Sequence, residues 1–95
     1  MSDEVYSRVI HYDEVKDIQV RVGVNIFRDV EYLFVRKYYR DFDGEFRPSN
    51  EGVNMPLDLN NSRELFAGLL EILSLGESKQ TIVDHFRELV ETTYA

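Results

Sequence analysis

The sequence predicts an α+β protein in which an antiparallel sheet is followed by C-terminal helices. Two observations predict this class. Apolar and polar residues alternate through much of the first half of the chain, as in strands that bury one face. From Ser62 onwards, apolar residues recur at the spacing of amphipathic helices. The 95 residues are enough for a single domain, and without cysteine its stability depends on packing or assembly, so we expect a dimer.

The clearest strand spans Ile18–Phe27, IQVRVGVNIF. Its apolar face consists of Ile18, Val20, Val22, Val24 and Ile26, and its other face of Gln19, Arg21, Gly23, Asn25 and Phe27. A second strand is predicted over Glu31–Tyr39, and the intervening Phe27-Arg28-Asp29-Val30 is short enough to turn the chain. Tyr32, Phe34 and Arg36 share one face of this strand. Two large rings are unusual on a face that is merely solvated.

Further strands are expected on either side of this hairpin. Val5–Tyr12 is compatible with a strand that leads into it. The dipeptide Asp43-Gly44 predicts a tight hairpin turn, because it readily supplies positive φ angles. Two short strands are then expected at Glu45–Pro48 and Val53–Leu57, with Asn50-Glu51-Gly52 as a turn between them. The sheet therefore covers about residues 5–57.

Two helices complete the chain, over about residues 61–75 and 78–92. The first runs from Ser62 to Leu75, with Asn60-Asn61-Ser62 as capping candidates and Gly76 at its end. Each helix has one apolar stripe and a mostly acidic polar face. We therefore expect the helices to cover a core or to form a protein interface, and not to contact phosphate.

The charge is unevenly distributed along the chain. The formal net charge of −7 argues against a partner as acidic as nucleic acid. Residues 16–47, however, hold seven of the 11 basic residues and seven of the 12 aromatic residues, whereas residues 48–95 hold three basic and eight acidic residues. Cations and rings are therefore concentrated together in the middle of the chain.

The sequence contains no recognisable catalytic, metal-binding or cofactor motif. Acidic residues flank Gly44 as in part of a calcium loop, but the glycine follows the second acid instead of the third, and a hairpin turn explains them better. Glycine-rich phosphate loops, long apolar runs and a signal-peptide pattern are also missing. We therefore expect a cytoplasmic protein that is not an enzyme and has no cofactor, metal or membrane partner.

The face that carries the rings has the composition that single-stranded nucleic acid requires. Its members are Arg21, Phe27, Tyr32, Phe34 and Arg36, and Arg28, Lys37, Tyr39 and Arg47 are close in sequence. Unpaired bases stack on rings at about 1–3 kcal/mol each, and arginines neutralise the backbone. In a second interpretation, the rings are buried under the helices or a second subunit. The pattern alone leaves both interpretations open.

The segment from Val22 to Met55 carries a specific combination of motifs. VRKYYRDFDGEFRPSNEGVNM contains an Arg-x-Tyr-aromatic run, an acidic Gly-Glu turn, a basic-Pro pair and a later Gly, and VGVNIFRDVEYLFVR precedes it as a hairpin. This combination resembles the transcriptional positive cofactor 4 family of single-stranded DNA-binding coactivators. The resemblance implies a curved four-stranded antiparallel sheet followed by a helix, paired into a homodimer that binds single strands or unwound duplex.

The resemblance also implies roles for individual residues. Phe27 and Tyr39 resemble the base-stacking aromatics of the family, with Tyr39 in place of a more usual tryptophan. Arg28, Arg36 and Arg47 resemble the basic residues that contact the backbone. Arg21 lies near this surface by strand parity.

Some positions depart from the family pattern. Asn50 and Glu51 stand where further basic residues are common, and Val30 stands where lysine is common, so phosphate contacts should be weaker. The second helix extends beyond the family core, and the lysine- and serine-rich tail of animal members is missing. In these respects the chain resembles a bacteriophage or bacterial homologue.

We therefore predict a homodimeric, non-sequence-specific single-stranded DNA-binding protein that acts in transcription, replication or recombination, in the host cytoplasm or nucleoid if it is phage-encoded. The alternative is an acidic protein-interaction adaptor that recruits replication or transcription proteins and binds DNA weakly. The dimer is expected to form chiefly through the helix that begins near Ser62, with Leu69 or Leu73 in the interface.

Overall fold

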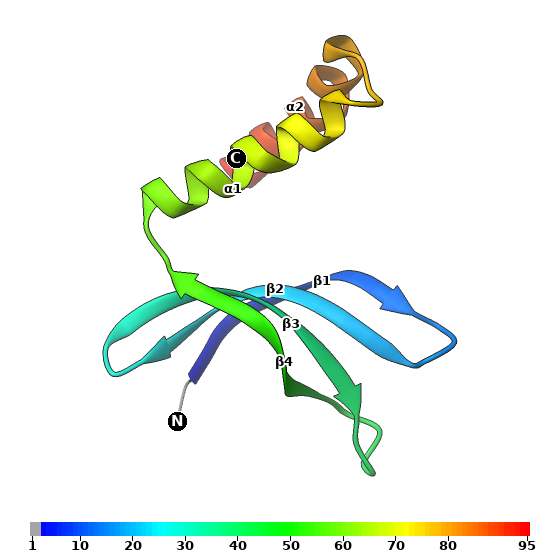
Figure 1. Ribbon diagram of the computed structural model, residues 1–95, viewed down its shortest axis with the longest axis vertical. Coiled ribbons are helices and arrows are strands. Elements are labelled where there is room, and N and C mark those ends of the chain that lie inside the picture. Colours follow the sequence, from blue (N-terminus) through cyan, green and yellow to red (C-terminus); the bar gives the residue numbers. More distant parts are fainter. Residues whose placement is uncertain (1–2) are drawn as a thin grey trace. The chain divides into compact units, whose positions relative to one another are not determined.

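The computed structural model describes residues 3–95, which form one sheet and two helices (Figure 1). The strands are β1 (Asp3–Asp13), β2 (Ile18–Phe27), β3 (Val30–Arg40) and β4 (Phe46–Pro56). They lie side by side in sequence order, and every neighbouring pair is antiparallel. The predicted α+β class and the four-stranded antiparallel sheet are confirmed.

The central hairpin follows the alternation in the sequence. β2 and β3 pair residue for residue along their common length. The two turn residues, Arg28 and Asp29, have positive φ angles of 51° and 64°. This is the conformation of two-residue turns whose twist matches that of antiparallel strands. The predicted hairpin is therefore confirmed, with β3 one residue longer at each end.

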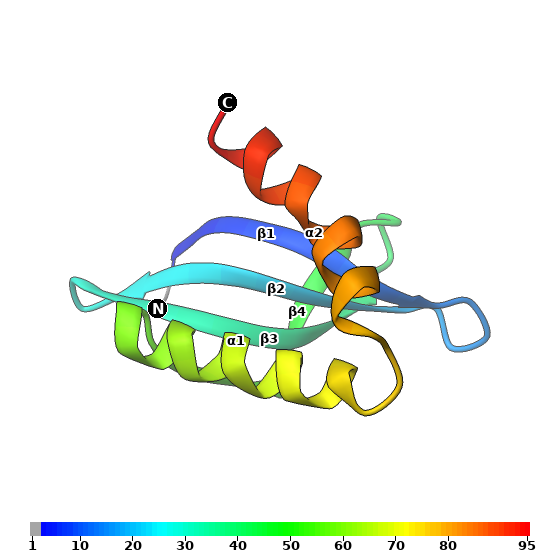
Figure 2. The ribbon, with the colours of Figure 1, turned by 90° about the horizontal axis from the view of Figure 1, so that it is seen from above.

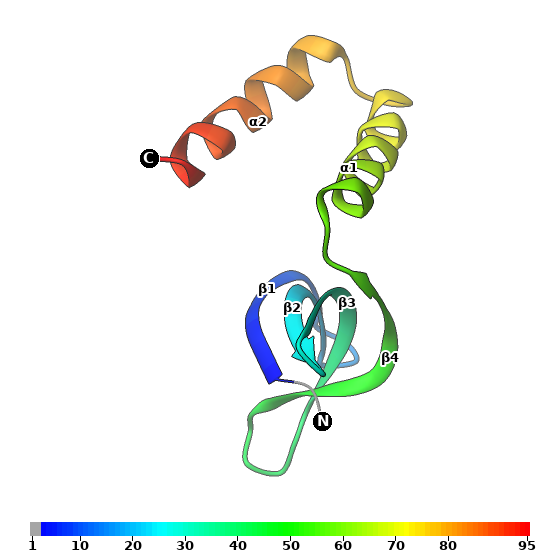
Figure 3. The same ribbon diagram turned by 90° about the vertical axis from the view of Figure 1, so that its left-hand side faces the viewer.

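Register shifts bend the first strand. In the pairing of β1 with β2, one shift falls between Glu4 and Tyr6 and another between Val9 and His11. Extra residues of this kind bend a strand and increase its twist. Figure 3 shows that the strands of the sheet are strongly curved.

The last strand differs from the prediction. We expected two short strands separated by a turn at Asn50-Glu51-Gly52, but β4 is a single strand of 11 residues that contains this segment. In its pairing with β3, Pro48 lies opposite Tyr38 and Gly52 lies opposite Arg36. Four residue steps of β4 therefore match two of β3. The turn-forming residues are accommodated in a bulge and do not reverse the chain.

The connection between β3 and β4 is a loop of residues 41–45, and not the tight two-residue turn expected at Asp43-Gly44. Gly44 has a φ of 81°, whereas Asp43 is not among the residues with positive φ. The Asp41 carboxylate organises the loop by accepting the N–H groups of Asp43 at 2.9 Å and Glu45 at 3.1 Å. A hairpin connection therefore accounts for the acidic residues that flank Gly44.

Two helices follow the sheet, α1 (Leu59–Ser74) and α2 (Lys79–Thr93). α1 begins earlier than predicted, because the Asp58 carboxylate accepts the N–H of Asn61 at 2.7 Å and caps the helix in place of Asn60-Asn61-Ser62. Ser78 caps α2 by accepting the N–H of Thr81 at 3.1 Å. The second helix is confirmed to within one residue at each end. The two helices leave their short connection in different directions (Figure 2).

The chain divides into two compact units, with the boundary between Asn61 and Ser62. Among the described residues, Gly23, Phe34 and Tyr38 alone are buried, and all three belong to the sheet. Neither helix contains a buried residue. Within the described residues, much of the apolar surface of the helices is therefore exposed.

Candidate nucleic-acid interface

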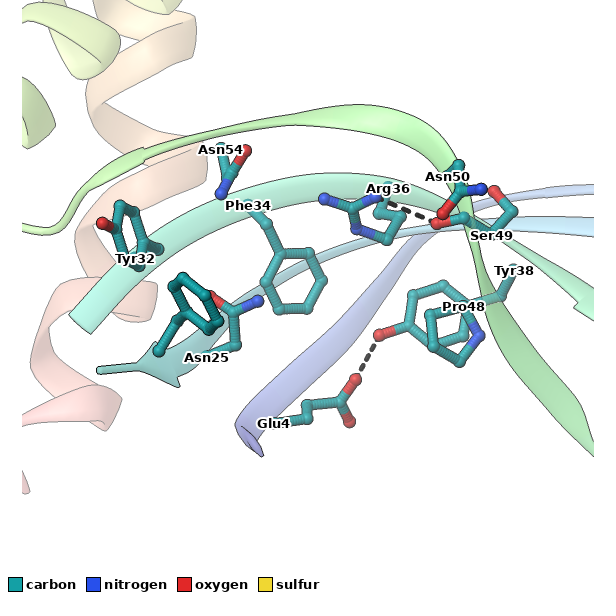
Figure 4. Close-up of a pocket in the computed structure, with 11 residues that line it drawn as sticks. Glu4, Asn25, Tyr32, Phe34, Arg36, Tyr38, Pro48, Ser49, Asn50 and Asn54 are labelled. Atoms are coloured by element: carbon teal, nitrogen blue, oxygen red, sulfur yellow. Dashed lines mark hydrogen bonds between the residues drawn. The ribbon is translucent and has the colours of Figure 1, made fainter. Parts of the chain in front are cut away.

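One face of the sheet contains a hollow with a volume of about 590 Å³. Its lining comes from all four strands and consists of Glu4, Asn25, Phe27, Tyr32, Phe34, Arg36, Tyr38, Pro48, Ser49, Asn50 and Asn54 (Figure 4). Strand alternation explains this set, since every second residue of β3 from Tyr32 to Tyr38 points to the same face. Rings, amides and an arginine therefore meet in one place.

Phe34 is among the residues that line the hollow and is only 2% exposed. Phe34 lies opposite Gly23 in the pairing of β2 with β3. A Cβ atom at Gly23 would lie 2.5 Å from the Phe34 ring and 2.3 Å from the backbone oxygen of Tyr6, which is too close for any side chain. The glycine therefore lets the Phe34 ring lie against β2.

A hydrogen-bond network around Tyr38 holds one end of the hollow. The Tyr38 hydroxyl donates to the Glu4 carboxylate (Figure 4), which also accepts the Ser7 hydroxyl at 3.1 Å. The Arg21 guanidinium lies 4.3 Å from the centre of the Tyr38 ring and donates to Gln19 Oε1 at 2.7 and 2.9 Å. Burial and then the bond to Glu4 raise the pKa of Tyr38 to about 12, so the hydroxyl keeps its proton at neutral pH.

The arginines of this face have no carboxylate partner among the described residues. Arg36 donates to the backbone oxygen of Ser49 at 2.9 Å. Arg28, in the β2–β3 turn, has its guanidinium 5.0 Å from the centre of the Phe27 ring. Neither of these arginines, nor Arg21, lies within 4.0 Å of a described acidic side chain. Their charge is therefore available to a phosphate.

Tyr39 and Arg47 lie on the opposite face, near the β3–β4 loop. They are opposite each other in the pairing of β3 with β4, one residue along from Tyr38, so strand alternation turns them away from the hollow. The Tyr39 hydroxyl donates to Glu51 at 3.0 Å, and Arg47 forms an ion pair with Asp41 at 2.7 Å. Both side chains are thus engaged with carboxylates of the same chain.

Two more ion pairs lie at this end of the sheet. Arg40 contacts Asp17 at 2.7 Å, and the Tyr12 hydroxyl donates to Asp17 at 2.7 Å. Lys37 contacts Glu51 at 3.2 Å. The bond from Arg40 and then that from Tyr12 lower the pKa of Asp17, and the bond from Lys37 is the largest cause of the lowered pKa of Glu51. We call these ion pairs, with Tyr39, Arg47 and Asp41, the loop-end cluster.

The structure brings together most of the residues predicted for the interface. Phe27, Tyr32, Phe34 and Arg36 line the hollow, Arg21 lies against Tyr38, and Arg28 lies beside Phe27. Tyr39 and Arg47 are not brought to the hollow. Their role in DNA binding stays a prediction.

Sequence reasoning did not select Tyr38, Asn25 or Asn54, which also line the hollow. Parity could have found Tyr38, because it follows Arg36 by two residues on the same strand. Asn25 was placed on this face, but nothing in the sequence set it apart. Asn54 lies beyond the bulge of β4, so its position opposite Phe34 depends on a register shift that the sequence does not reveal.

Within residues 3–95, neither helix has the length and apolar character needed to cross a membrane. The same residues contain no cluster of three or more histidine, aspartate or glutamate side chains arranged to hold a metal ion. The acidic residues near Gly44 are used in the loop itself, where Asp41 binds backbone N–H groups and Arg47.

A protein-family model matches the part of the chain that forms most of the sheet and its hollow. The family model described as Transcriptional Coactivator p15 (PC4) matches residues 16–62, a span that contains β2, β3 and β4. The chain is therefore similar to the PC4 family, in agreement with the resemblance carried by its sequence.

A solved structure is similar along almost the entire chain. It is the bacteriophage T5 homolog of the eukaryotic transcription coactivator PC4, a protein implicated in recombination-dependent DNA replication. The two chains are 25% identical, with a TM-score of 0.67 and 98% of each chain covered. The match therefore includes the helical segment, most of which lies outside the residues that the family model matches. The comparison with curated proteins gives no match.

Proposed function

We propose that this protein binds single-stranded DNA without sequence preference, through the hollow and the arginines beside it. The observation that carries this proposal is the presence on one face of partly exposed rings and of arginines without carboxylate partners among the described residues. Rings stack on the faces of unpaired bases whatever their identity, and guanidinium groups donate hydrogen bonds to the phosphates between the bases. An intact duplex does not expose base faces, so single strands should be preferred.

Each residue of the interface has a proposed role. Phe27 and Tyr32 stack on bases, and Phe34 supports the hollow from below. Arg21, Arg28 and Arg36 contact phosphates. Tyr39 and Arg47 are proposed as secondary contacts, because each is engaged with a carboxylate that it must leave before it can bind DNA.

We also propose that the protein acts as a homodimer. The described part of the single chain buries three residues, all of them in the sheet, while Leu69 and Leu73 in α1 are 51% and 37% exposed. A chain of this length without disulfides needs a larger core than this. Light scattering at micromolar concentration should give twice the mass of one chain, and Leu73→Glu should dissociate or unfold the dimer. A monomeric mass for the wild type would contradict the proposal.

The proposed role requires no bond-making chemistry and no cofactor, and we propose a non-enzymatic protein that acts where single strands arise in the host cytoplasm or nucleoid. Transcription, replication and recombination all expose such strands. The T5 homolog is implicated in recombination-dependent DNA replication, which makes that process the first one to examine.

Fluorescence anisotropy with one labelled oligonucleotide, free or annealed into a blunt duplex, tests the proposal. We expect the single strand to bind at least about tenfold more tightly, because each lost stacking contact costs about 1–3 kcal/mol. Strands of different composition should bind with similar affinity. Equal affinity for the blunt duplex would contradict the proposal, and binding to neither form would favour the adaptor hypothesis.

A further inference from the structure

Asn25 differs from the other residues of the hollow in one respect. Its side-chain oxygen, Oδ1, is buried and accepts no hydrogen bond. Among the described residues, it is the only buried side-chain nitrogen or oxygen without a hydrogen-bond partner. Folded proteins rarely leave a buried acceptor without a donor, since the group loses its water and gains nothing in return. A donor from outside the chain would satisfy this oxygen, but it can reach the oxygen only if the side chains that cover it move.

The position of Asn25 limits what that donor can be. Asn25 belongs to β2, where it lies opposite Tyr32 of β3, and its side chain lies between those of Tyr32 and Phe34 in the hollow (Figure 4). On β4, Asn54 lies opposite Phe34 and exposes a second amide. A ligand at this place has to offer a flat face to rings and polar atoms to amides. A nucleobase has both, and the hollow has a volume typical of sites for small ligands.

We propose that the side chains covering Asn25 Oδ1 move when an unpaired base enters the hollow, so that this oxygen accepts an N–H group from the Watson–Crick edge of the base, an inference that rests on the proposed function. All four bases carry an N–H group on this edge, so the contact does not select one base over the others. In a duplex the same N–H group is bonded to the complementary base. Asn25 therefore makes the hollow sensitive to whether a base is paired, and not to which base it is.

Thymine provides the sharpest probe, because its N3–H is its only N–H group in a DNA strand and is the group that pairs with adenine. Oligo(dT) and an oligomer of N3-methylthymidine of the same length have equal charge and similar rings, but the second lacks this donor. The wild-type protein should bind oligo(dT) about two- to tenfold more tightly, the value of one hydrogen bond.

Asn25→Leu is the matching variant, since leucine has a similar volume and no polar atom. It should abolish the difference between the two oligomers, whereas Asn50→Leu, a change at an exposed amide of the same hollow, should preserve it. Asn25→Leu should also unfold at the same temperature as the wild type or higher, because it removes an unpaired buried acceptor.

The possible outcomes separate the two proposals. Equal affinity of the wild type for both oligomers, or a difference that persists in Asn25→Leu, would overturn the role of Asn25 while leaving single-strand binding intact. A loss of stability in Asn25→Leu would also overturn it, because the oxygen would then already have a partner such as water. Failure to bind oligo(dT) at all would instead contradict the proposed function.

Discussion

The hollow and the loop-end cluster are built from the same kinds of residue, yet their cations are engaged differently. In the hollow, Arg36 bonds a neutral backbone oxygen, and beside it Arg21 lies over the ring of Tyr38. In the loop-end cluster, Arg40 and Arg47 bond aspartate carboxylates at 2.7 Å. A cation that is already paired must give up its partner before it binds a phosphate. The two regions are therefore unequal as surfaces for DNA.

This difference explains how an acidic protein can offer a cationic surface. The net charge is −7, but acidic residues of the loop-end cluster form ion pairs with Arg40, Arg47 and Lys37 and neutralise them. Binding depends on the charges that face the ligand more than on the total. The distribution of ion pairs is thus more informative than the net charge.

A substitution at Gly23, against which Phe34 lies, should have the largest effect on stability. In Gly23→Ala the new methyl group would meet the Phe34 ring and the backbone of Tyr6, and we expect the free energy of unfolding to fall by about 1–3 kcal/mol. Thermal unfolding followed by circular dichroism measures this. Gly68→Ala in α1 is the control, since its methyl group would meet nothing within 4 Å and should stabilise the helix by about 0.5–1 kcal/mol. Unchanged stability in Gly23→Ala would mean that Phe34 does not lie against β2.

Removing one ring from the hollow and one from the β3–β4 loop should sharpen the comparison. Phe27→Ala should lose about 1–3 kcal/mol of binding free energy for single-stranded DNA without a change in salt dependence, because no phosphate contact is removed. Phe42 is fully exposed in the β3–β4 loop, and Phe42→Ala should keep the wild-type affinity. Anisotropy titrations at several salt concentrations measure both. If Phe27→Ala unfolds while its folded fraction binds normally, the ring belongs to the core and does not stack on bases.

Acid should weaken the loop-end cluster. Arg40 and then Tyr12 hold the pKa of Asp17 below its ordinary value, and Arg47 is the largest cause of the lowered pKa of Asp41. A carboxyl with a lowered pKa in the folded state adds stability above its ordinary pKa, and this stability is lost as the pH falls through the lowered value. The unfolding temperature should therefore fall in acid.

Asp17→Asn tests the origin of this pH dependence. Near neutral pH it should unfold at a lower temperature than the wild type, and the difference should shrink as the pH falls and the wild-type Asp17 becomes protonated. A difference that stays constant from neutral to strongly acidic pH would show that the ionised carboxylate is not the cause.

Much of the hollow could be predicted from strand alternation. The strict period of two in Ile18–Phe27 determines which residues share a face, and the two-residue turn then carries that parity into β3. Phe27, Tyr32, Phe34 and Arg36 were therefore grouped correctly without knowledge of the fold. Burial is not encoded in this pattern, and the 2% exposure of Phe34 depends on its packing over Gly23.

Beyond the β3–β4 loop, alternation no longer determines the register. Asn50-Glu51-Gly52 has the composition of a turn, but hydrogen bonding to a neighbouring strand keeps the segment within β4 as a bulge. Ion pairs are equally hard to predict. Arg47 and Asp41 are six residues apart, and they meet because the loop brings both to the same end of the sheet.

The most direct test of the account compares one arginine from each region. Arg28→Gln and Arg47→Gln each remove one positive charge, and the measurement is the slope of log affinity for single-stranded DNA against log salt concentration. Arg28→Gln should reduce the magnitude of this slope by about 0.7, the value of one phosphate contact on a single strand. Arg47→Gln should leave it almost unchanged, because Asp41 already neutralises Arg47. An equal loss in both variants, or a loss in Arg47→Gln alone, would contradict the account.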